Sequence, residues 1–371
     1  MAKLGEVCKV SPSTKNIERQ GAWLLNLDMV EQETGRVIEY KYVGEDDLNG
    51  SIVQFDTENV LYSKLRPNLN KVVLPQKDGF STSELLPLRP DASVLNKDYL
   101  AAFLRSDSFV TWAVSKTAGA KMPRLGTKDL MNAEIPVPSI EQQKKIAEKF
   151  KKLEQLISLR KQQLAKLDEL VKARFVEMFG DPKDNRSNLV KIGEIGDLTS
   201  GGTPSRSNSE YFNGSIRWYS AGELNSLYLP DSIEHISRTA LSQSAAKLFE
   251  KGTLMIGMYD TAAFKMGILT EQSSSNQACA NLKPTEQYSV IWLYYLFDIM
   301  KPIFLTERQG VRQKNLSLSK IRNFNIPSAP LSLQNQFAAF VERVDQQKQT
   351  VQQSLEKLEL MKKALMQEYF G

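Results

Sequence analysis

The stretch "KARFVEMFGDP", from Lys172 to Pro182, returns in similar form where the chain ends, as "KALMQEYFG" from Lys363 to Gly371. A shift of 191 residues places Gly180 on Gly371, and the match continues upstream at the same shift. Further aligned pairs are Phe179 with Phe370, Ala147 with Ala338, Ile135-Pro136 with Ile326-Pro327, Leu125 with Leu316, and Gly119 with Gly310. The chain is therefore a tandem duplication, and its second copy ends where its first copy does.

Length and composition are those of a folded protein with more than one domain. The chain has 371 residues, of which 41% are hydrophobic and 25% charged, with a net charge of +5. No apolar run reaches the roughly 20 residues of a membrane span, and the first residues lack the plan of a signal peptide. We therefore expect a cytoplasmic protein. Cys8, Cys279 and the one histidine, His235, lie far apart in sequence, so we expect neither a metal site nor a disulfide framework.

A long helix is predicted after each of two proline-rich boundaries, "IPVPS" (Ile135 to Ser139) and "IPSAPLS" (Ile326 to Ser332). Apolar residues follow each boundary at alternating spacings of four and three, which is typical of a coiled-coil seam. The seam residues are Ile146, Phe150, Leu153, Ile157, Leu164, Leu167 and Val171 in the first copy, and Phe337, Val341, Val344, Val351, Leu355, Leu358 and Leu365 in the second. Polar residues interrupt it at Arg160, Arg174, Lys348 and Lys362.

Each predicted helix has about 40 residues and would span about 60 Å. One possibility is that each helix packs on its own globule. However, a stripe of this length is too long to be covered by a small domain, and two similar heptad helices in one chain favour packing on each other, antiparallel if the globules lie at opposite ends.

The segments before the helices predict mixed α/β globules with short strands and many turns. The strand candidates include "SIVQF", "VLYSKL" and "KVVLP" in the first copy, and "GTLMIGM" and "KMGILT" in the second. Helices are expected over Asn96 to Val114 and over Tyr288 to Leu305. The predicted fold class is α/β (α+β), a pseudo-twofold tandem repeat of two globular domains alternating with two long helices that pack as an antiparallel coiled coil. The predicted domains are globules at 1–138 and 181–329 and helices at 139–180 and 330–371.

Motifs for catalysis are missing from the sequence, whereas basic and polar loops are present. We find no P-loop, no G-x-G-x-x-G after a strand, no H-E-x-x-H and no G-x-S-x-G. The loops "YSKLRPNLNKV" (Tyr62 to Val72), "GAKMPRLG" (Gly119 to Gly126) and "GVRQKNLS" (Gly310 to Ser317) carry side chains that suit phosphates and base edges. The candidate DNA-binding residues are Ser63, Lys64, Arg66, Asn68, Lys121 and Arg124 in the first globule, and Tyr259, Lys265, Arg312, Gln313 and Lys314 in the second.

Three longer stretches together resemble one known family. They are "LYSKLRPNLNKV", the boundary and helix "IPVPSIEQQKKIAEKFKKLEQLI" that leads to "ARFVEMFGDP", and "GGTPSRSNSEYFNGSIRWYSAGEL". This combination resembles the specificity (S) subunit of bacterial type I restriction-modification systems over essentially the whole chain. The second copy departs from the pattern at Ser332 and Leu333, where the first has Glu141 and Gln142.

The resemblance implies a DNA-binding, non-catalytic subunit with two target-recognition domains, at 1–138 and 181–329. Such subunits bind a bipartite, asymmetric site in double-stranded DNA and recruit two methyltransferase (M) and two restriction (R) subunits. S-adenosylmethionine, ATP and Mg would then belong to those partners, and this chain would hold no cofactor. The helix pair would fix the gap between the two half-sites. Two alternatives stay open: a coiled-coil assembly protein whose globules bind protein, and the specificity subunit of a type IIB-like system.

Overall fold

The computed structural model describes residues 1–48, 51–119, 121–185, 188–308 and 315–371, which fold into two compact units. Unit 1 comprises Met1–Gln162 and Val351–Gly371, and unit 2 comprises Gln163–Thr350. The two long helices are α5 (Ile140–Phe179) and α9 (Leu331–Phe370), and each contributes one segment to each unit. No helix in the described part of the chain is long and apolar enough to cross a membrane.

Unit 1 contains twelve short strands and four short helices among its described residues. The strands are β1 (Ala2–Lys3), β2 (Cys8–Val10), β3 (Ala22–Leu25), β4 (Lys41–Val43), β5 (Ile52–Phe55), β6 (Val60–Ser63), β7 (Val72–Val73), β8 (Gly79–Thr82), β9 (Leu85–Pro90), β10 (Thr117–Ala118), β11 (Arg124–Leu125) and β12 (Glu134–Ile135). The helices are α1 (Leu4–Val7), α2 (Lys97–Leu104), α3 (Asp107–Ser115) and α4 (Thr127–Met131).

Unit 2 repeats this plan. Its strands are β13 (Leu189–Lys191), β14 (Gly196–Ser200), β15 (Ile216–Tyr219), β16 (Asn225–Tyr228), β17 (Glu234–Ile236), β18 (Leu248–Phe249), β19 (Leu254–Gly257), β20 (Met266–Ile268), β21 (Ser273–Ser275), β22 (Cys279–Pro284) and β23 (Asn325–Pro327). Its helices are α6 (Arg238–Gln243), α7 (Val290–Thr306) and α8 (Leu318–Asn323).

The sheets of the two units share one topology. The order β2-β9-β6-β7 in unit 1 matches β14-β22-β19-β20 in unit 2, where β16 adds a fifth strand. The order β4-β3-β8-β5 likewise matches β17-β15-β21-β18, and in both sheets the two central strands are parallel. β1 pairs with β12 as β13 pairs with β23. The predicted tandem repeat and α/β fold class are confirmed at the level of strand order.

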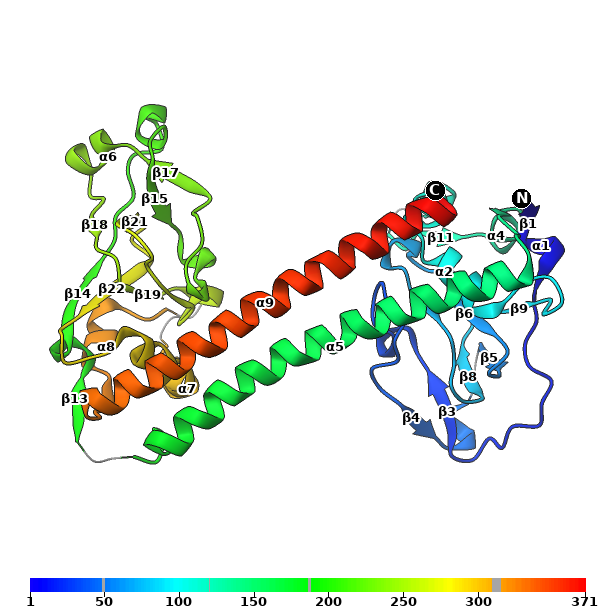
Figure 1. Ribbon diagram of the computed structural model, residues 1–371, viewed down its shortest axis with the longest axis horizontal. Helices are drawn as coiled ribbons and strands as arrows, with labels where there is room; N and C mark the ends of the chain where they lie inside the picture. The colour runs from blue at the N-terminus through cyan, green and yellow to red at the C-terminus, as the bar shows by residue number, and fades with distance from the viewer. Residues whose placement is uncertain (49–50, 120, 186–187, 309–314) are drawn as a thin grey trace. The chain divides into compact units, whose positions relative to one another are not determined.

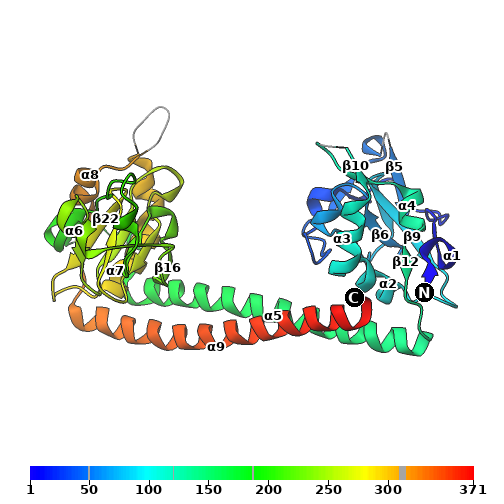
Figure 2. The same ribbon diagram turned by 90° about the horizontal axis from the view of Figure 1, so that it is seen from above.

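The two long helices pair antiparallel within each unit, as predicted for a coiled coil. In unit 1, Phe150 stacks on Phe370 with ring centroids 5.8 Å apart, and Glu154 bonds Lys362 at 3.0 Å. In unit 2, Phe175 packs edge-on against Phe337 at 5.3 Å. The paired helix segments lie side by side in both views (Figures 1 and 2). Every predicted seam residue is buried or half-buried.

Ion pairs accommodate Arg174, Lys348 and Lys362, which interrupt the seam. Lys348 Nζ lies 2.6 Å from Asp168 on the facing helix segment of unit 2, and Lys362 pairs with Glu154 in unit 1. Arg174 pairs with Glu177 on its own helix at 2.7 Å. Polar pairs of this kind favour one register over others.

The repeated helix ending has a structural reason in unit 1. Phe370, 6% exposed, packs against Tyr99 and Phe103 of α2, and Ser108 Oγ donates a hydrogen bond to its carbonyl at 2.6 Å. In unit 2 the equivalent Phe179 packs against Trp292 of α7. Each globule therefore binds the start of the helix that follows it and the end of the other long helix.

A buried glutamine fastens each long helix to its globule. The Oε1 of Gln143 accepts from Asn96 N at 2.9 Å, and its Nε2 donates to the carbonyls of Val94 and Pro138. Gln334, 191 residues later, bonds Ser289 N at 2.8 Å in the same way. Both glutamines are fully buried, and Asn96 and Ser289 are the N-caps of α2 and α7. Each of these glutamines satisfies buried backbone groups.

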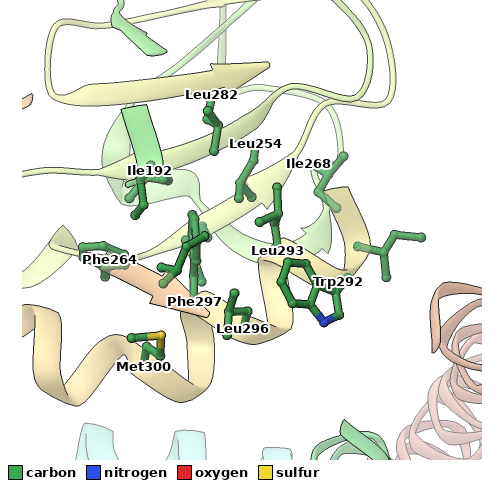
Figure 3. Close-up of a cluster of buried hydrophobic side chains, with 14 of the residues drawn as sticks. Ile192, Leu254, Phe264, Ile268, Leu282, Trp292, Leu293, Leu296, Phe297 and Met300 are labelled. Carbon is green, nitrogen blue, oxygen red and sulfur yellow. The ribbon is translucent and has the colours of Figure 1, made fainter. Parts of the chain in front are cut away.

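The core of unit 2 lies between α7 and its five-stranded sheet (Figure 3). Leu293, Leu296 and Phe297 of α7 are fully buried among strand residues such as Leu254 and Leu282. The helix continues through Pro302 without interruption. In unit 1, by contrast, the single helix predicted over Asn96 to Val114 is wrong, because Ser106 caps a new helix, α3, by accepting from Phe109 N.

Asp56 links the two main sheets of unit 1 through a buried network. Its side chain is 2% exposed, and its Oδ2 lies 2.7 Å from Ser13 Oγ and 2.7 Å from Arg89 Nη2 on β9. Burial alone would raise the pKa of Asp56, but the hydrogen bonds from Ser13 and Arg89 outweigh it and lower the pKa from its usual 3.8 to about 2. The folded state therefore favours the ionised carboxylate.

Because the folded pKa lies below the unfolded one, this stabilisation is fully present above pH 3.8 and is lost as the pH falls toward 2. We expect Asp56→Asn to lower the free energy of unfolding by about 2 kcal/mol at neutral pH, and the difference from the unaltered protein to vanish near pH 2. Urea unfolding at several pH values measures this. Glu58→Gln, two residues away on the surface, serves as the control. An equal loss in both variants would contradict the assignment.

Candidate nucleic-acid interface

Each unit has its own candidate DNA-binding loop, between β6 and β7 in unit 1 and between β19 and β20 in unit 2. Each loop contains two non-glycine residues with positive φ. In unit 1 these are Arg66 (50°) and Asn70 (49°), and in unit 2 they are Asp260 (48°) and Phe264 (53°). The spacing is the same, and 194 residues separate the equivalent positions. Such conformations cost on the order of 1 kcal/mol or more each, so the surrounding structure must impose them.

A second chain segment closes each loop in the same way. In unit 1, Leu125 N donates to Lys64 O at 2.9 Å, and Arg66 N donates to Pro123 O at 2.8 Å. In unit 2, Leu316 N donates to Met258 O, the equivalent of Lys64, at 2.8 Å. Two of the basic segments predicted separately, Tyr62 to Val72 and Gly119 to Gly126, therefore meet in unit 1, where β11 lies beside the β6–β7 loop.

The five cationic or amide candidates of unit 1 cluster around this junction. Arg66, Asn68, Lys121 and Arg124 are exposed and Lys64 is half-buried. Arg124 is already engaged, because its Nε lies 3.1 Å from Glu84 Oε1. Loops held by a rigid sheet and carrying Lys, Arg and Asn suit phosphates and base edges.

The burial of Ser63 contradicts the prediction that this residue contacts DNA. Its side chain is buried, with the residue 2% exposed, and its hydroxyl donates to Leu65 O at 2.8 Å. All four residues of β6 are buried, so Ser63 lies in the interior, and its hydroxyl bonds the backbone at the start of the following loop.

Unit 2 presents a different set of side chains on the equivalent loop. Tyr259 is 39% exposed, Asp260 is exposed and Lys265 is half-buried. Asp260 N donates to Asn315 Oδ1 at 3.2 Å. The other predicted residues of this unit, Arg312, Gln313 and Lys314, lie outside the described residues.

Sequence comparison missed the equivalence of the two loops. Aligned at a shift of 194, "YSKLRPNLNKV" and "IGMYDTAAFKM" share one letter, Lys71 with Lys265. The rest of the repeat aligns at 191, so these loops fall out of register. Asp260 and Asn315 therefore had no signal that marked them as part of the site.

A buried arginine holds the unit 1 loop from below. Arg105, with its side chain 8% exposed, donates from Nη2 and Nε to Val72 O at 2.7 and 3.2 Å, and its own carbonyl accepts from Asn70 Nδ2 at 3.0 Å. Its Nη1 lies 3.3 Å from Glu154 of α5, which also bonds Lys362 of α9. Burial lowers the pKa of Arg105, and Glu154 opposes that shift. The loop is thereby connected to the helix pair.

The unit 2 loop is held by aromatic packing instead. Phe264, at the position of Asn70, is 1% exposed and stacks on Phe304 of α7 with ring centroids 4.8 Å apart. It also packs edge-on against Phe297 at 6.5 Å, as seen in Figure 3. Two different supports, hydrogen bonds in unit 1 and apolar packing in unit 2, therefore hold left-handed residues at equivalent positions of the two loops.

No group of three or more His, Cys, Asp or Glu side chains able to hold a metal ion occurs among the residues that the structure describes. Burial raises the pKa of both cysteine thiols, Cys8 and Cys279, to about 12.

Curated relatives match parts of the chain. It is 27% identical over 124 residues to the specificity subunit of the type I restriction enzyme EcoDI from Escherichia coli, covering 33% of this chain and 27% of that protein. It is 23% identical over 172 residues to the EcoR124I/EcoR124II specificity subunit from Escherichia coli, covering 44% of this chain and 42% of that protein. The matches thus span less than half the length of these relatives.

Solved structures share the fold along the whole chain. The type I restriction-modification S subunit from M. genitalium gives a TM-score of 0.62 at 15% identity, covering 100% of this chain and 95% of that chain. A chain from a solved type I R-M system gives a TM-score of 0.61 at 17% identity, covering 100% of this chain and 96% of that chain. The family of the type I restriction modification DNA specificity domain matches residues 1–169 and 185–360, once in each copy of the repeat. The chain therefore belongs to the type I restriction modification DNA specificity domain family.

Proposed function

We propose that this protein is the DNA sequence-recognition subunit of a type I restriction-modification complex and binds a bipartite, asymmetric site in double-stranded DNA. The main support is the pair of loops closed in the same way, which present Arg66 and Asn68 in unit 1 but Tyr259 and Asp260 in unit 2. One backbone framework that displays different polar groups suits two half-sites of different sequence.

We further propose that the chain is non-catalytic and recruits two methyltransferase and two restriction subunits. Family membership and the names of its curated relatives support this assignment. S-adenosylmethionine, ATP and Mg would be bound by those partners, which carry out methylation and cleavage. In unit 1, Arg105 and Glu154 connect the β6–β7 loop to α5 and α9, so a partner bound to these helices would be coupled to that loop.

Binding measured against salt tests the proposal. In the complex with its methyltransferase partners, log affinity for duplex DNA should fall linearly with log salt concentration, because bound phosphates release counterions. Lys121→Ala and Lys64→Ala should each reduce the slope by about 1 if each lysine contacts a phosphate. Lys151→Ala, on the exposed face of α5, serves as the control and should leave the slope unchanged.

Methyladenine mapping by single-molecule sequencing, with and without this gene, should then reveal one motif in two parts. A binding curve that does not respond to salt, or a genome with no motif that depends on this gene, would overturn the assignment and favour a protein-binding role for the globules.

A further inference from the structure

We propose that the first left-handed position of each loop, Arg66 in unit 1 and Asp260 in unit 2, is an equivalent base-reading position. Arg66 selects guanine, and Asp260 selects a base whose major-groove edge carries an amino group, cytosine or adenine. This inference rests on the proposed function and adds to it the chemistry that distinguishes the two half-sites.

The first step is geometric. Both residues occupy the same place between matched strands, have φ values of 50° and 48°, and precede a second left-handed residue by four positions. Each carbonyl also accepts a hydrogen bond from the backbone N–H three residues on, from Leu69 at 2.9 Å and from Ala263 at 3.1 Å. The short 3₁₀ turn of the loop is shifted by one residue, at Pro67–Leu69 and at Asp260–Ala262, but the backbone at the left-handed residue itself is similar, and so is the direction of its Cα–Cβ bond. Position 66 of unit 1 and position 260 of unit 2 therefore present their side chains similarly on the two loops.

The second step concerns what holds these residues. The backbone N–H of Arg66 is bonded to Pro123 O, and that of Asp260 to Asn315 Oδ1. Both side chains are exposed. The hydrogen bonds thus fix the strained main chain and leave the side chains at the surface. A strained residue that the fold holds in place, with its side chain at the surface, is a frequent arrangement at binding sites.

The third step is electrostatic. An arginine on a DNA-facing loop can contact either a phosphate or the O6 and N7 atoms of guanine, so Arg66 alone leaves its role open. A carboxylate is repelled by phosphates, and its favourable contact in the major groove is an amino donor. Because Asp260 occupies the position of Arg66, that position cannot be a phosphate anchor in both units. Its common role is base discrimination, and phosphate contacts fall to neighbours such as Lys64 and Lys121.

The experiment uses the complex with its methyltransferase partners, methylome sequencing and binding to duplexes with single base-pair changes. Arg66→Lys keeps the charge but loses the two-bond contact to guanine. We expect it to retain general DNA affinity while discrimination at one G·C pair of one half-site falls about 5- to 150-fold, the range for a bidentate contact. Asp260→Ala should relax one position in the other half-site by a similar factor.

Asp260→Asn is the most discriminating variant. Asparagine tolerates the left-handed conformation and can form two hydrogen bonds with adenine. If Asp260 reads cytosine, preference at its position should move toward adenine; if it already reads adenine, that preference should strengthen. Asn188→Ala replaces another exposed left-handed residue (φ 51°), directly before β13, and should leave the motif intact.

Two outcomes would overturn the inference. In one, Arg66→Lys or Asp260→Ala changes affinity equally for all sequences, which would assign the residue to phosphate contact or simple repulsion. In the other, the motif stays unchanged in every variant. Failure of the proposed function would give a different result from failure of this inference. In that case the complex with the unaltered protein would not recognise any two-part motif.

Discussion

Replacing Arg105 by methionine should lower the free energy of unfolding of unit 1 by about 3 kcal/mol, because it leaves a buried polar network without its cation. The Val72 carbonyl would lose both of its guanidinium donors, and Glu154 would lose one of its two cationic partners among the described residues, Arg105 and Lys362. The β6–β7 loop rests on this network, so we expect one half-site to lose affinity while the other keeps it. Hydrogen exchange of β7 and α2, together with binding to each half-site, measures the two effects.

Asp298→Asn is the matched control in unit 2. It breaks the pair between Asp298 and Lys172, whose side chains are 30% and 55% exposed at a separation of 2.8 Å. Exposed pairs contribute about 0–1 kcal/mol, so this variant should remain close to the unaltered protein. A loss in the control as large as that from Arg105→Met would show that burial of the network is not what matters.

Replacing Phe175 by alanine should destabilise unit 2 by about 3–5 kcal/mol, the range for removing a buried phenylalanine. Phe175 is fully buried and packs against Phe337 of α9 and Trp292 of α7, with ring centroids at 5.3 and 6.4 Å. Its loss would open a cavity where the helix pair meets the globule. Thermal denaturation, followed by hydrogen exchange in α7, measures the change.

Val176→Ala, on the next residue of α5, tests whether burial is the cause. Val176 is 42% exposed, and a surface substitution of this kind changes stability by about 0.5 kcal/mol or less. If the two variants melt together, or if Phe175→Ala affects only unit 1, the aromatic contacts described for unit 2 would be wrong.

Local periodicity and self-similarity were enough to predict the large features. The 191-residue repeat predicted two equivalent globules, and matched strand orders confirm them. The four-and-three spacing from Ile146 onward predicted paired helices, because a continuous apolar stripe needs a partner surface wherever the chain folds. The strand candidates "VLYSKL" and "GTLMIGM" correspond to β6 and β19. The predicted domain limits, 1–138 and 181–329 for the globules, stay predictions, since both compact units take in segments of the long helices.

Features that depend on contacts between residues far apart in the sequence could not be predicted from local sequence patterns. Arg105 lies within the single helix predicted over Asn96 to Val114, but it is the C-cap of α2 and binds residues 33 positions before and 49 positions after it. Ser63 looked like a loop donor, but its hydroxyl is directed inward.

The sequence by itself determined that this protein is a duplicated α/β chain with two long seam-bearing helices, because those properties are encoded in spacing and repetition. Only the tertiary structure decided that Arg66 and Asp260 are equivalent. Their loops share almost no letters, and the likeness lies in backbone angles that Pro123 and Asn315, distant in sequence, hold in place by hydrogen bonds. Hydrogen bonds between segments more than 50 residues apart leave no periodic trace in a sequence, which is why the equivalence of these two positions is visible only in the folded chain.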